Sequence, residues 1–138
     1  MSHRRVVIDH LGVGVRDYEE SRAFYSRALA PLGFELVAET GADNRAAGFG
    51  ADGFDDFWIH EGRPLGRMHV AFAADNQEQV DAFHAAALEA GGRDNGPPGI
   101  RPEYSDAYYA AFVLDPNGNN IEAVFHADEP GHMGTAPR

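Results

Sequence analysis

The sequence contains no cysteine and no lysine, and these two absences exclude several kinds of chemistry. Without cysteine there is no thiolate nucleophile, no disulfide and no cysteine-type zinc site. Without lysine there is no candidate for Schiff-base catalysis. Only four serines are present, and none lies in a Gly-x-Ser-x-Gly nucleophile pattern. Chemistry assisted by a metal ion on histidine and carboxylate ligands is what remains.

Basic residues and long apolar runs are also scarce. The 138 residues include 11 basic and 22 acidic side chains, a formal charge of −11, so nucleic acid and anionic lipid are not expected partners. No apolar run approaches the roughly 20 residues that span a membrane, and residues 1–5 lack a signal-peptide core. We expect one cytoplasmic domain with no membrane or nucleic-acid partner.

The sequence contains two successive copies of one structural pattern. Each half predicts a strand, then a helix with an aspartate cap and a glycine terminator, then further strands. Asp17 and Gly33 bound the first helix and Asp75 and Gly91 the second, sixteen residues apart in both cases. The opening strands are predicted over residues 6–15 and 67–74. Four side chains take matching places in the two halves: His10 and His69 in the opening strands, and His60 and Glu122 in the last strand of each half.

Strand periodicity places these four side chains away from the core. Successive residues of a strand point to opposite faces, and a half-buried strand keeps its apolar residues on one of them. His10 and His69 alternate with apolar neighbours, as does Glu122 between Ile121 and Ala123. The separation of His10 from His60 is fifty residues and that of His69 from Glu122 is fifty-three, which suggests equivalent pairs.

Several further residues are candidates for a substrate pocket. The segment 95–105 is rich in Gly and Pro, cannot be a central strand and is predicted to be a loop, so Arg101, Tyr104 and also Tyr108 could line a pocket. Trp58 shares the predicted face of His60, and Tyr109 could join it as an apolar wall.

A second set of signals concerns the end of the chain. The run Asp115-Pro116-Asn117-Gly118-Asn119 has strong turn chemistry, which predicts a hairpin of residues 109–114 and 120–126. The tail 127–138 has little to bury and is expected to be mobile.

Three segments together resemble the vicinal oxygen chelate superfamily, which includes glyoxalases, bleomycin-resistance proteins and extradiol dioxygenases. They are Ile8-Asp9-His10-Leu11-Gly12-Val13, Met68-His69-Val70-Ala71-Phe72 and Leu114-Asp115-Pro116-Asn117-Gly118-Asn119-Asn120-Ile121-Glu122. The resemblance implies an α+β fold, in which two tandem βαβββ modules form a curled mixed sheet around a cleft. The domain would cover residues 1–126, with one module over about 6–61 and the other over about 67–126.

The resemblance also implies one divalent metal ion, Zn, Ni, Fe, Mn or Co, which acts as a Lewis acid on neighbouring oxygens of a substrate. His10, His69 and Glu122 match the family's ligand positions, and His60 is matched to the fourth, where glyoxalase I has Glu. With His60 bound the site would hold three imidazoles and one carboxylate, and without it a 2-His-1-carboxylate set. Both ligand sets stay open on sequence grounds.

Two functions from different classes follow. The first is a metal-dependent glyoxalase-like enzyme of the lyase or isomerase type, in which Glu122, or alternatively His60, moves the proton; a small metal-dependent dioxygenase is a variant of it. The second is a non-catalytic protein that sequesters a drug, as bleomycin-resistance proteins do. A small-molecule substrate or drug is the expected ligand in either case. Family analogy also implies a homodimer, in which the modules pair within one chain or across two.

Overall fold

The structure is a computed structural model and describes residues 7–127. Two β-α-β-β-β modules follow one another along the chain, as expected from the repeat. The first comprises β1 (Leu11–Val15), α1 (Tyr18–Leu29), a 3₁₀ turn (Ala30–Leu32), β2 (Glu35–Glu39), β3 (Ala46–Gly50) and β4 (Phe57–Glu61). The second comprises β5 (His69–Ala73), α2 (Gln77–Glu89), β6 (Arg93–Ile100), β7 (Tyr108–Leu114) and β8 (Asn120–His126).

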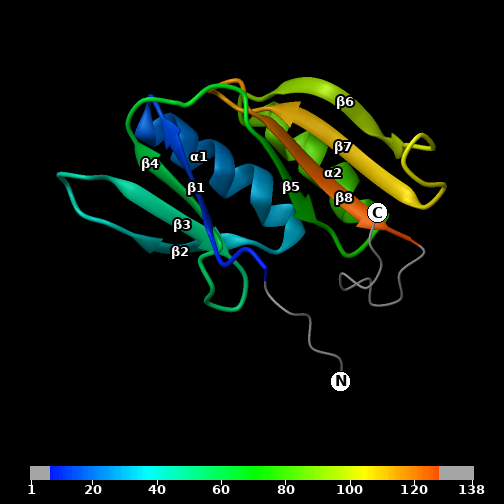
Figure 1. The fold of residues 1–138 in the computed structure, drawn as a ribbon, viewed down its shortest axis with the longest axis horizontal. Helices are drawn as coiled ribbons and strands as arrows, with labels where there is room; N and C mark the ends of the chain where they lie inside the picture. The colour runs from blue at the N-terminus through cyan, green and yellow to red at the C-terminus, as the bar shows by residue number, and fades with distance from the viewer. Residues whose placement is uncertain (1–6, 128–138) are drawn as a thin grey trace.

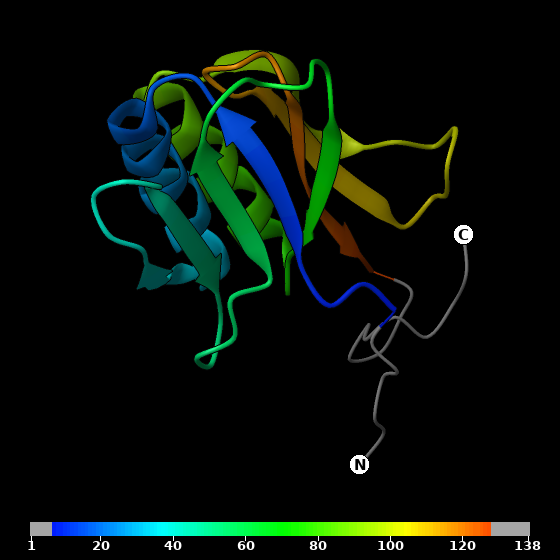
Figure 2. The ribbon, with the colours of Figure 1, turned by 60° about the vertical axis from the view of Figure 1, so that its left-hand side comes forward.

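Each module forms its own four-stranded mixed sheet, and the two sheets have the same strand order. The first sheet runs β1-β4-β3-β2 and the second β5-β8-β7-β6, with the first two strands parallel and the others antiparallel in both. Figure 1 shows the two sheets side by side with both helices behind them, and Figure 2 shows the same arrangement from the side. The predicted fold class is confirmed, although the two sheets do not close into one.

Both helices begin at a side-chain cap. Asp17 accepts a 3.0 Å hydrogen bond from the backbone N–H of Glu20, as predicted for the first helix. The second helix is capped by Asn76, which accepts a 2.8 Å bond from the backbone N–H of Gln79, so the prediction that Asp75 is the cap was wrong by one residue. Asp75 and Asn76 both have a side-chain oxygen that can accept the capping hydrogen bond, so residue type alone does not distinguish between them.

One apolar core joins the two modules. The inner faces of both sheets pack on the helices, and α1 lies against α2. Phe57 of β4 meets Phe72 of β5 edge to face, with ring centroids 5.1 Å apart. The two sheets therefore turn their apolar faces to the same interior and leave their other faces, called the outer faces below, on the far side from the helices.

A buried polar cluster also ties the modules together. The hydroxyl of Tyr25, on α1, donates a hydrogen bond to the carboxylate of Asp115, in the turn between β7 and β8. Asp115 accepts further bonds from the backbone N–H groups of Asn117 and Asn119 and from the Asn119 amide. Burial, together with the Asp115 carboxylate, raises the pKa of Tyr25 well above its ordinary value.

Two strands differ from the sequence-based prediction. The first strand starts at Leu11, so His10 precedes it; Val6, at the predicted start, lies outside the described residues. The segment 95–105 is not all loop, because β6 extends to Ile100 and only residues 101–107 connect it to β7. β6 is an edge strand whose register shifts around Gly96, and an edge strand tolerates Pro97 and Pro98 because one of its sides needs no partner.

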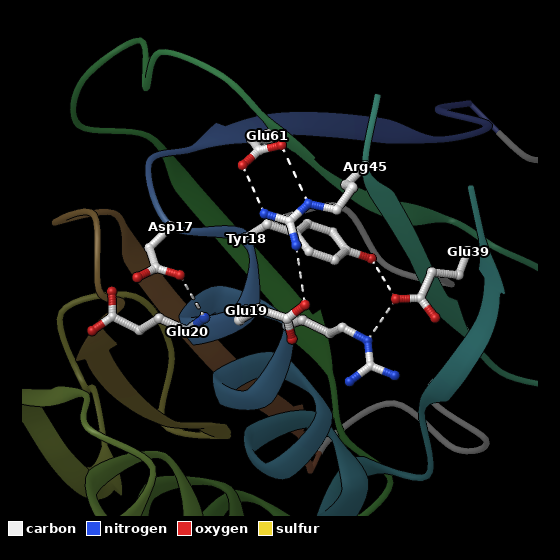
Figure 3. A network of polar contacts seen from close by, with 8 residues as sticks. Asp17, Tyr18, Glu19, Glu20, Glu39, Arg45 and Glu61 are labelled. Atoms are coloured by element: carbon white, nitrogen blue, oxygen red, sulfur yellow. Dashed lines mark hydrogen bonds and ion pairs between the residues drawn. The ribbon is translucent and has the colours of Figure 1, made fainter. Parts of the chain in front are cut away.

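A surface network links the start of α1 to the first sheet (Figure 3). Arg45 binds Glu61 at 2.8 Å and Glu19 at 3.1 Å, and its guanidinium lies 4.8 Å from the ring centroid of Tyr18. The Tyr18 hydroxyl donates a 2.6 Å bond to Glu39.

The predicted tail, residues 127–138, lies outside the described residues except for Ala127. Among the described residues, no helix is both long and apolar enough to cross a membrane.

Candidate functional site

The best-defined polar cluster on an outer face surrounds Glu122 of β8. Oε1 of Glu122 lies 2.8 Å from Nε2 of His69 on β5, and Oε2 accepts a 2.5 Å hydrogen bond from the hydroxyl of Tyr108 on β7. The carboxylate is buried, with 1% of its side chain exposed, while 54% of the His69 side chain is exposed. A buried carboxylate requires partners, and here each oxygen has one.

Strand register explains how these residues meet. Glu122 lies directly opposite Ala71, so His69, two residues earlier on β5, shares its face and is its diagonal neighbour. Phe112 is the residue opposite Glu122 on β7, and Tyr108, four residues before Phe112 on that strand, reaches Glu122 with its hydroxyl. The outer face of the second sheet therefore gathers one imidazole, one carboxylate and one phenol.

An open cavity of about 370 Å³ lies over this cluster. It is lined by His69, Tyr108 and Glu122 together with Glu103 and Tyr104 from the loop between β6 and β7. The ring of Tyr104 packs 4.9 Å from that of Tyr108. The structure thus brings Tyr104, a predicted pocket residue, to the side of Glu122.

Two other predicted pocket residues lie elsewhere. The Arg101 guanidinium donates hydrogen bonds to the carbonyls of Gly99 and Pro97 and stacks 5.2 Å from the centroid of Phe112. Arg101 therefore holds the end of β6 through these hydrogen bonds. It lines an adjoining cavity and not the cavity over Glu122. Tyr109 points to the helix side, where its hydroxyl donates a 2.6 Å bond to Asp81, and this bond, together with burial, raises the Tyr109 pKa to about 12.

The candidate residues of the first module lie on the outer face of the other sheet. The Trp58 indole lies against Gly48 of β3, where an added Cβ would be 2.6 Å from its ring, and the His60 ring lies over Gly12 and Gly14 of β1. His10, just before β1, has 63% of its side chain exposed and pairs with Asp9 at 2.8 Å. That hydrogen bond raises the pKa of His10.

The register of the first sheet changes the match between the modules. His10 precedes its helix cap Asp17 by seven residues, and His69 precedes its cap Asn76 by seven, so His10 and His69 are equivalent. Two residues after each histidine, Gly12 lies opposite Trp58 and Ala71 lies opposite Glu122. The place of Glu122 in the first module is therefore occupied by Trp58, and His60 lies one pleat farther on.

The four predicted ligands do not meet within this chain. His60 is opposite Gly14, four residues beyond His10, which corresponds to about 13 Å along the strand. Across residues 7–127, no three His, Asp or Glu side chains converge closely enough to hold a metal ion. The pair His69 and Glu122 is the part of the predicted set that the structure brings together.

Sequence reasoning missed Glu103 and Phe112, whereas it named Tyr108 as a candidate pocket residue, and Tyr108 does line the cavity. Phe112 could have been found by counting back from the Asn117-Gly118 turn, because a hairpin fixes which residues face each other. Glu103 belongs to a loop, and no periodic pattern predicts the direction of its side chain.

The chain is similar to known proteins both in sequence and in fold. The model of the Glyoxalase/Bleomycin resistance protein/Dioxygenase superfamily matches residues 7–123. A glyoxalase/bleomycin resistance protein from Albidiferax ferrireducens T118 is 30% identical, with a TM-score of 0.68 over 85% of this chain and 97% of that one. No curated protein matches the chain.

Two further solved structures share the fold at lower identity. A glyoxylase/bleomycin resistance protein/dioxygenase domain from Frankia sp. EAN1pec is 16% identical, with a TM-score of 0.67 over 89% of this chain and 99% of that one. Glyoxalase I from Zea mays is 20% identical, with a TM-score of 0.65 over 89% of this chain but 46% of that one. The maize protein therefore contains about twice the length that is matched here.

Proposed function

The chain belongs to the glyoxalase/bleomycin resistance protein/dioxygenase superfamily, and we propose that it is a metal-dependent, glyoxalase-like enzyme of the lyase or isomerase type. Its substrate would be a small organic molecule that binds the metal through neighbouring oxygens. The observation that carries the proposal is the contact of His69 with the buried Glu122 at the floor of a cavity open to small molecules.

The chemistry of this pair fits a divalent metal. Imidazole nitrogen and carboxylate oxygen are ligands of Zn, Fe, Mn, Ni and Co. Their 2.8 Å separation is close to the roughly 3 Å expected of adjacent ligands that each lie about 2.1 Å from one ion. When bound, the metal would polarise a carbonyl or hydroxyl oxygen of the substrate as a Lewis acid.

Two donors are too few for a protein metal site, and His10 is the third that we propose. His10 occupies the place equivalent to His69 in the first module and is exposed beside the outer face of the first sheet. Since His10 does not join His69 and Glu122 within the chain, we propose a homodimer in which the first module of one copy meets the second module of the other.

The chain's own residues would then handle binding and proton transfer. Tyr108 holds one oxygen of Glu122, which fixes the direction of the other oxygen toward His69. Tyr104 and Glu103 wall the cavity and limit the access of water. Glu122 is the proposed base, with His60 as the alternative, because a carboxylate beside the metal can take a proton from a substrate carbon whose carbonyl is polarised.

The test is metal content together with turnover. Protein purified without a histidine tag should hold about one Zn, Fe, Mn, Ni or Co per chain, and His69→Ala and Glu122→Ala should each lose both the metal and the activity toward 2-oxo and 2-hydroxy compounds. Activity that persists in metal-free protein would rule out this function.

A second candidate function is a small metal-dependent dioxygenase, favoured by the presence of Trp58 at the place of a fourth ligand. With Trp58 there, His10 of one copy and His69 and Glu122 of the other would form a 2-His-1-carboxylate set, the ligand pattern of non-haem iron oxygenases. Iron as the bound metal and oxygen consumption with catechols would favour this function. A protein that takes up no metal under reconstitution, yet binds a drug at equimolar ratio, would instead be a sequestering protein.

A further inference from the structure

The cavity over Glu122 is one end of a longer groove on the outer face of the second sheet. An adjoining cavity of about 260 Å³ shares Glu103 and Tyr104 with it. A third cavity, of about 560 Å³, shares Asn95 and Asn120 with the second. We call these three adjoining cavities the groove, and Figure 1 shows the sheet of β5, β8, β7 and β6 that forms its floor.

The far end of the groove is basic, which is unusual in a chain of formal charge −11. Arg67 and Arg93 line the third cavity, and no Asp or Glu lines it. Neither arginine forms an ion pair with another described residue, whereas Arg22, Arg27 and Arg45 all do. Two arginines without carboxylates therefore face one cavity.

The acidic residue beside Arg93 does not neutralise it. Asp94 points to the other side of β6, where it lies 2.9 Å from Nε2 of His84 and accepts a 3.0 Å bond from the backbone N–H of Gly96. These two contacts hold the pKa of Asp94 below its usual range. The positive charge of Arg93 is thus available to a ligand.

The amide groups of the third cavity add hydrogen-bond donors. Asn95 donates to Oδ1 of Asn120 at 3.1 Å, which fixes the orientation of the Asn120 amide. The Asn120 side-chain nitrogen then has no hydrogen-bond acceptor among residues 7–127. A nitrogen donor and two guanidinium groups at one cavity suit an anion.

The basic end is close to the proposed metal ligands. Asn120 lies opposite His69 and two residues before Glu122 on β8, about 7 Å along the strand, and Arg67 lies two residues before His69, just outside β5. The opposite end carries Glu103 and Glu122. The groove is therefore polarised, with carboxylates at one end and guanidinium groups at the other.

We propose that Arg67 and Arg93 bind the anionic head group, a carboxylate or phosphate, of a small substrate that extends along the groove to His69 and Glu122. The planar fork of arginine matches both head groups through paired N–H···O bonds. Glu103 would repel the anionic end and so set the direction in which the substrate enters. The anion site stands on Arg67, Arg93 and Asn120, and its link to catalysis rests on the function proposed above.

The test is a titration of ¹⁵N-labelled protein with inorganic phosphate and, separately, with sodium acetate at constant ionic strength. We expect saturable shifts at the side-chain amides of Asn95 and Asn120 and at the Nε–H groups of Arg67 and Arg93. Arg67→Gln and Arg93→Gln should each weaken binding about tenfold or more. Arg27→Gln, which removes the same charge from the helix side, should change the affinity less than twofold.

Either anion alone is sufficient to support the inference, and the preferred one identifies the head group. Equal affinity in the wild type, Arg67→Gln and Arg93→Gln, or no saturable shift with either anion, would overturn it. The outcome is separable from that for the metal site, because the titration uses metal-free protein and is repeated with His69→Ala. Wild-type protein that binds the anion but takes up no metal on reconstitution would remove the proposed enzyme function and leave the anion site.

Discussion

Trp58 of β4 and Glu122 of β8 occupy the same place in the two modules, opposite Gly12 and Ala71 respectively. The duplicated fold thus has two pairs of equivalent positions, His10 with His69 and Trp58 with Glu122, and three of these four side chains can bind a metal. An indole can form a wall but cannot ligate. The two modules therefore differ at this place: the second has a buried carboxylate, Glu122, and the first has an indole, Trp58.

This relationship predicts different outcomes for two histidine variants. His60 lies over Gly12 and Gly14, one pleat beyond the equivalent of Glu122, so His60→Ala should leave the metal content near one per chain. His10→Ala should abolish metal binding. Elemental analysis of the two purified variants checks this, and loss of metal in His60→Ala would restore the four-ligand set expected from the sequence.

Tyr108→Phe should weaken metal binding without unfolding the protein. The variant removes the 2.5 Å hydrogen bond that orients Glu122, and loss of such a support to a ligand typically costs about 10–100-fold in metal affinity. A competition titration with a chelator measures the affinity, and the absorption spectrum of the Co²⁺ form reports on ligand geometry. Tyr104→Phe is the matched control, because Tyr104 packs on Tyr108 through its ring. Equal metal affinities in the two variants would contradict the role given to Tyr108.

Tyr25→Phe should destabilise the fold more than Tyr109→Phe does, although each removes one tyrosine-to-carboxylate hydrogen bond. The bond from Tyr25 to Asp115 is buried between the modules, and its loss should cost about 1–3 kcal/mol of the free energy of unfolding. The bond from Tyr109 to Asp81 is at the surface and should contribute about 0.5–1 kcal/mol. Urea unfolding of both variants makes the comparison, and equal losses would show that burial does not strengthen the contact.

The sequence predicted the overall fold because its signals are local and repeated. Asp17, the Asn117-Gly118 turn and the alternation around Glu122 each determine a short stretch of backbone, and all of them agree with two βαβββ modules. The boundary of the second helix was less certain, because Asp75 and Asn76 are adjacent and either side chain can cap a helix; the structure has Asn76. The edge strand β6 was missed because its prolines are tolerated only where no partner strand follows, which depends on the complete sheet.

The candidate site was less predictable because it depends on register and on tertiary contacts. Counting residues matched His60 with Glu122, but loops of different length shift such counts, and only strand pairing identifies Trp58 as the equivalent. The groove could not be predicted for the same reason. Arg67, just before β5, and Arg93, on β6, are far apart in the sequence and line one cavity only because the second module folds into a single sheet.

The free energy of unfolding should fall as the pH rises from about 10 to 12, in part because of Tyr18. Burial and the bond to Glu39 raise the pKa of Tyr18 from 10.0 to about 12. A raised tyrosine pKa favours the protonated folded form, so the contribution is complete below pH 10 and is lost as the pH passes 12. Tyr18→Phe should show a shallower decline over this range in urea unfolding, and a decline as steep as that of the wild type would assign the alkaline loss to other groups.

Mixing two inactive variants should restore metal binding if the site is shared between two copies. In a mixed dimer of His10→Ala and Glu122→Ala, one of the two sites combines both substitutions and the other combines neither. Refolding the variants together should therefore yield intact sites, up to one for each mixed dimer, whereas each variant alone should bind none. If all ligands came from one chain, every site would still carry one substitution and mixing would restore nothing. Metal content after mixing thus distinguishes a site built between the outer faces of two copies from one closed within a single chain, with wild-type protein carried through the same refolding as the control.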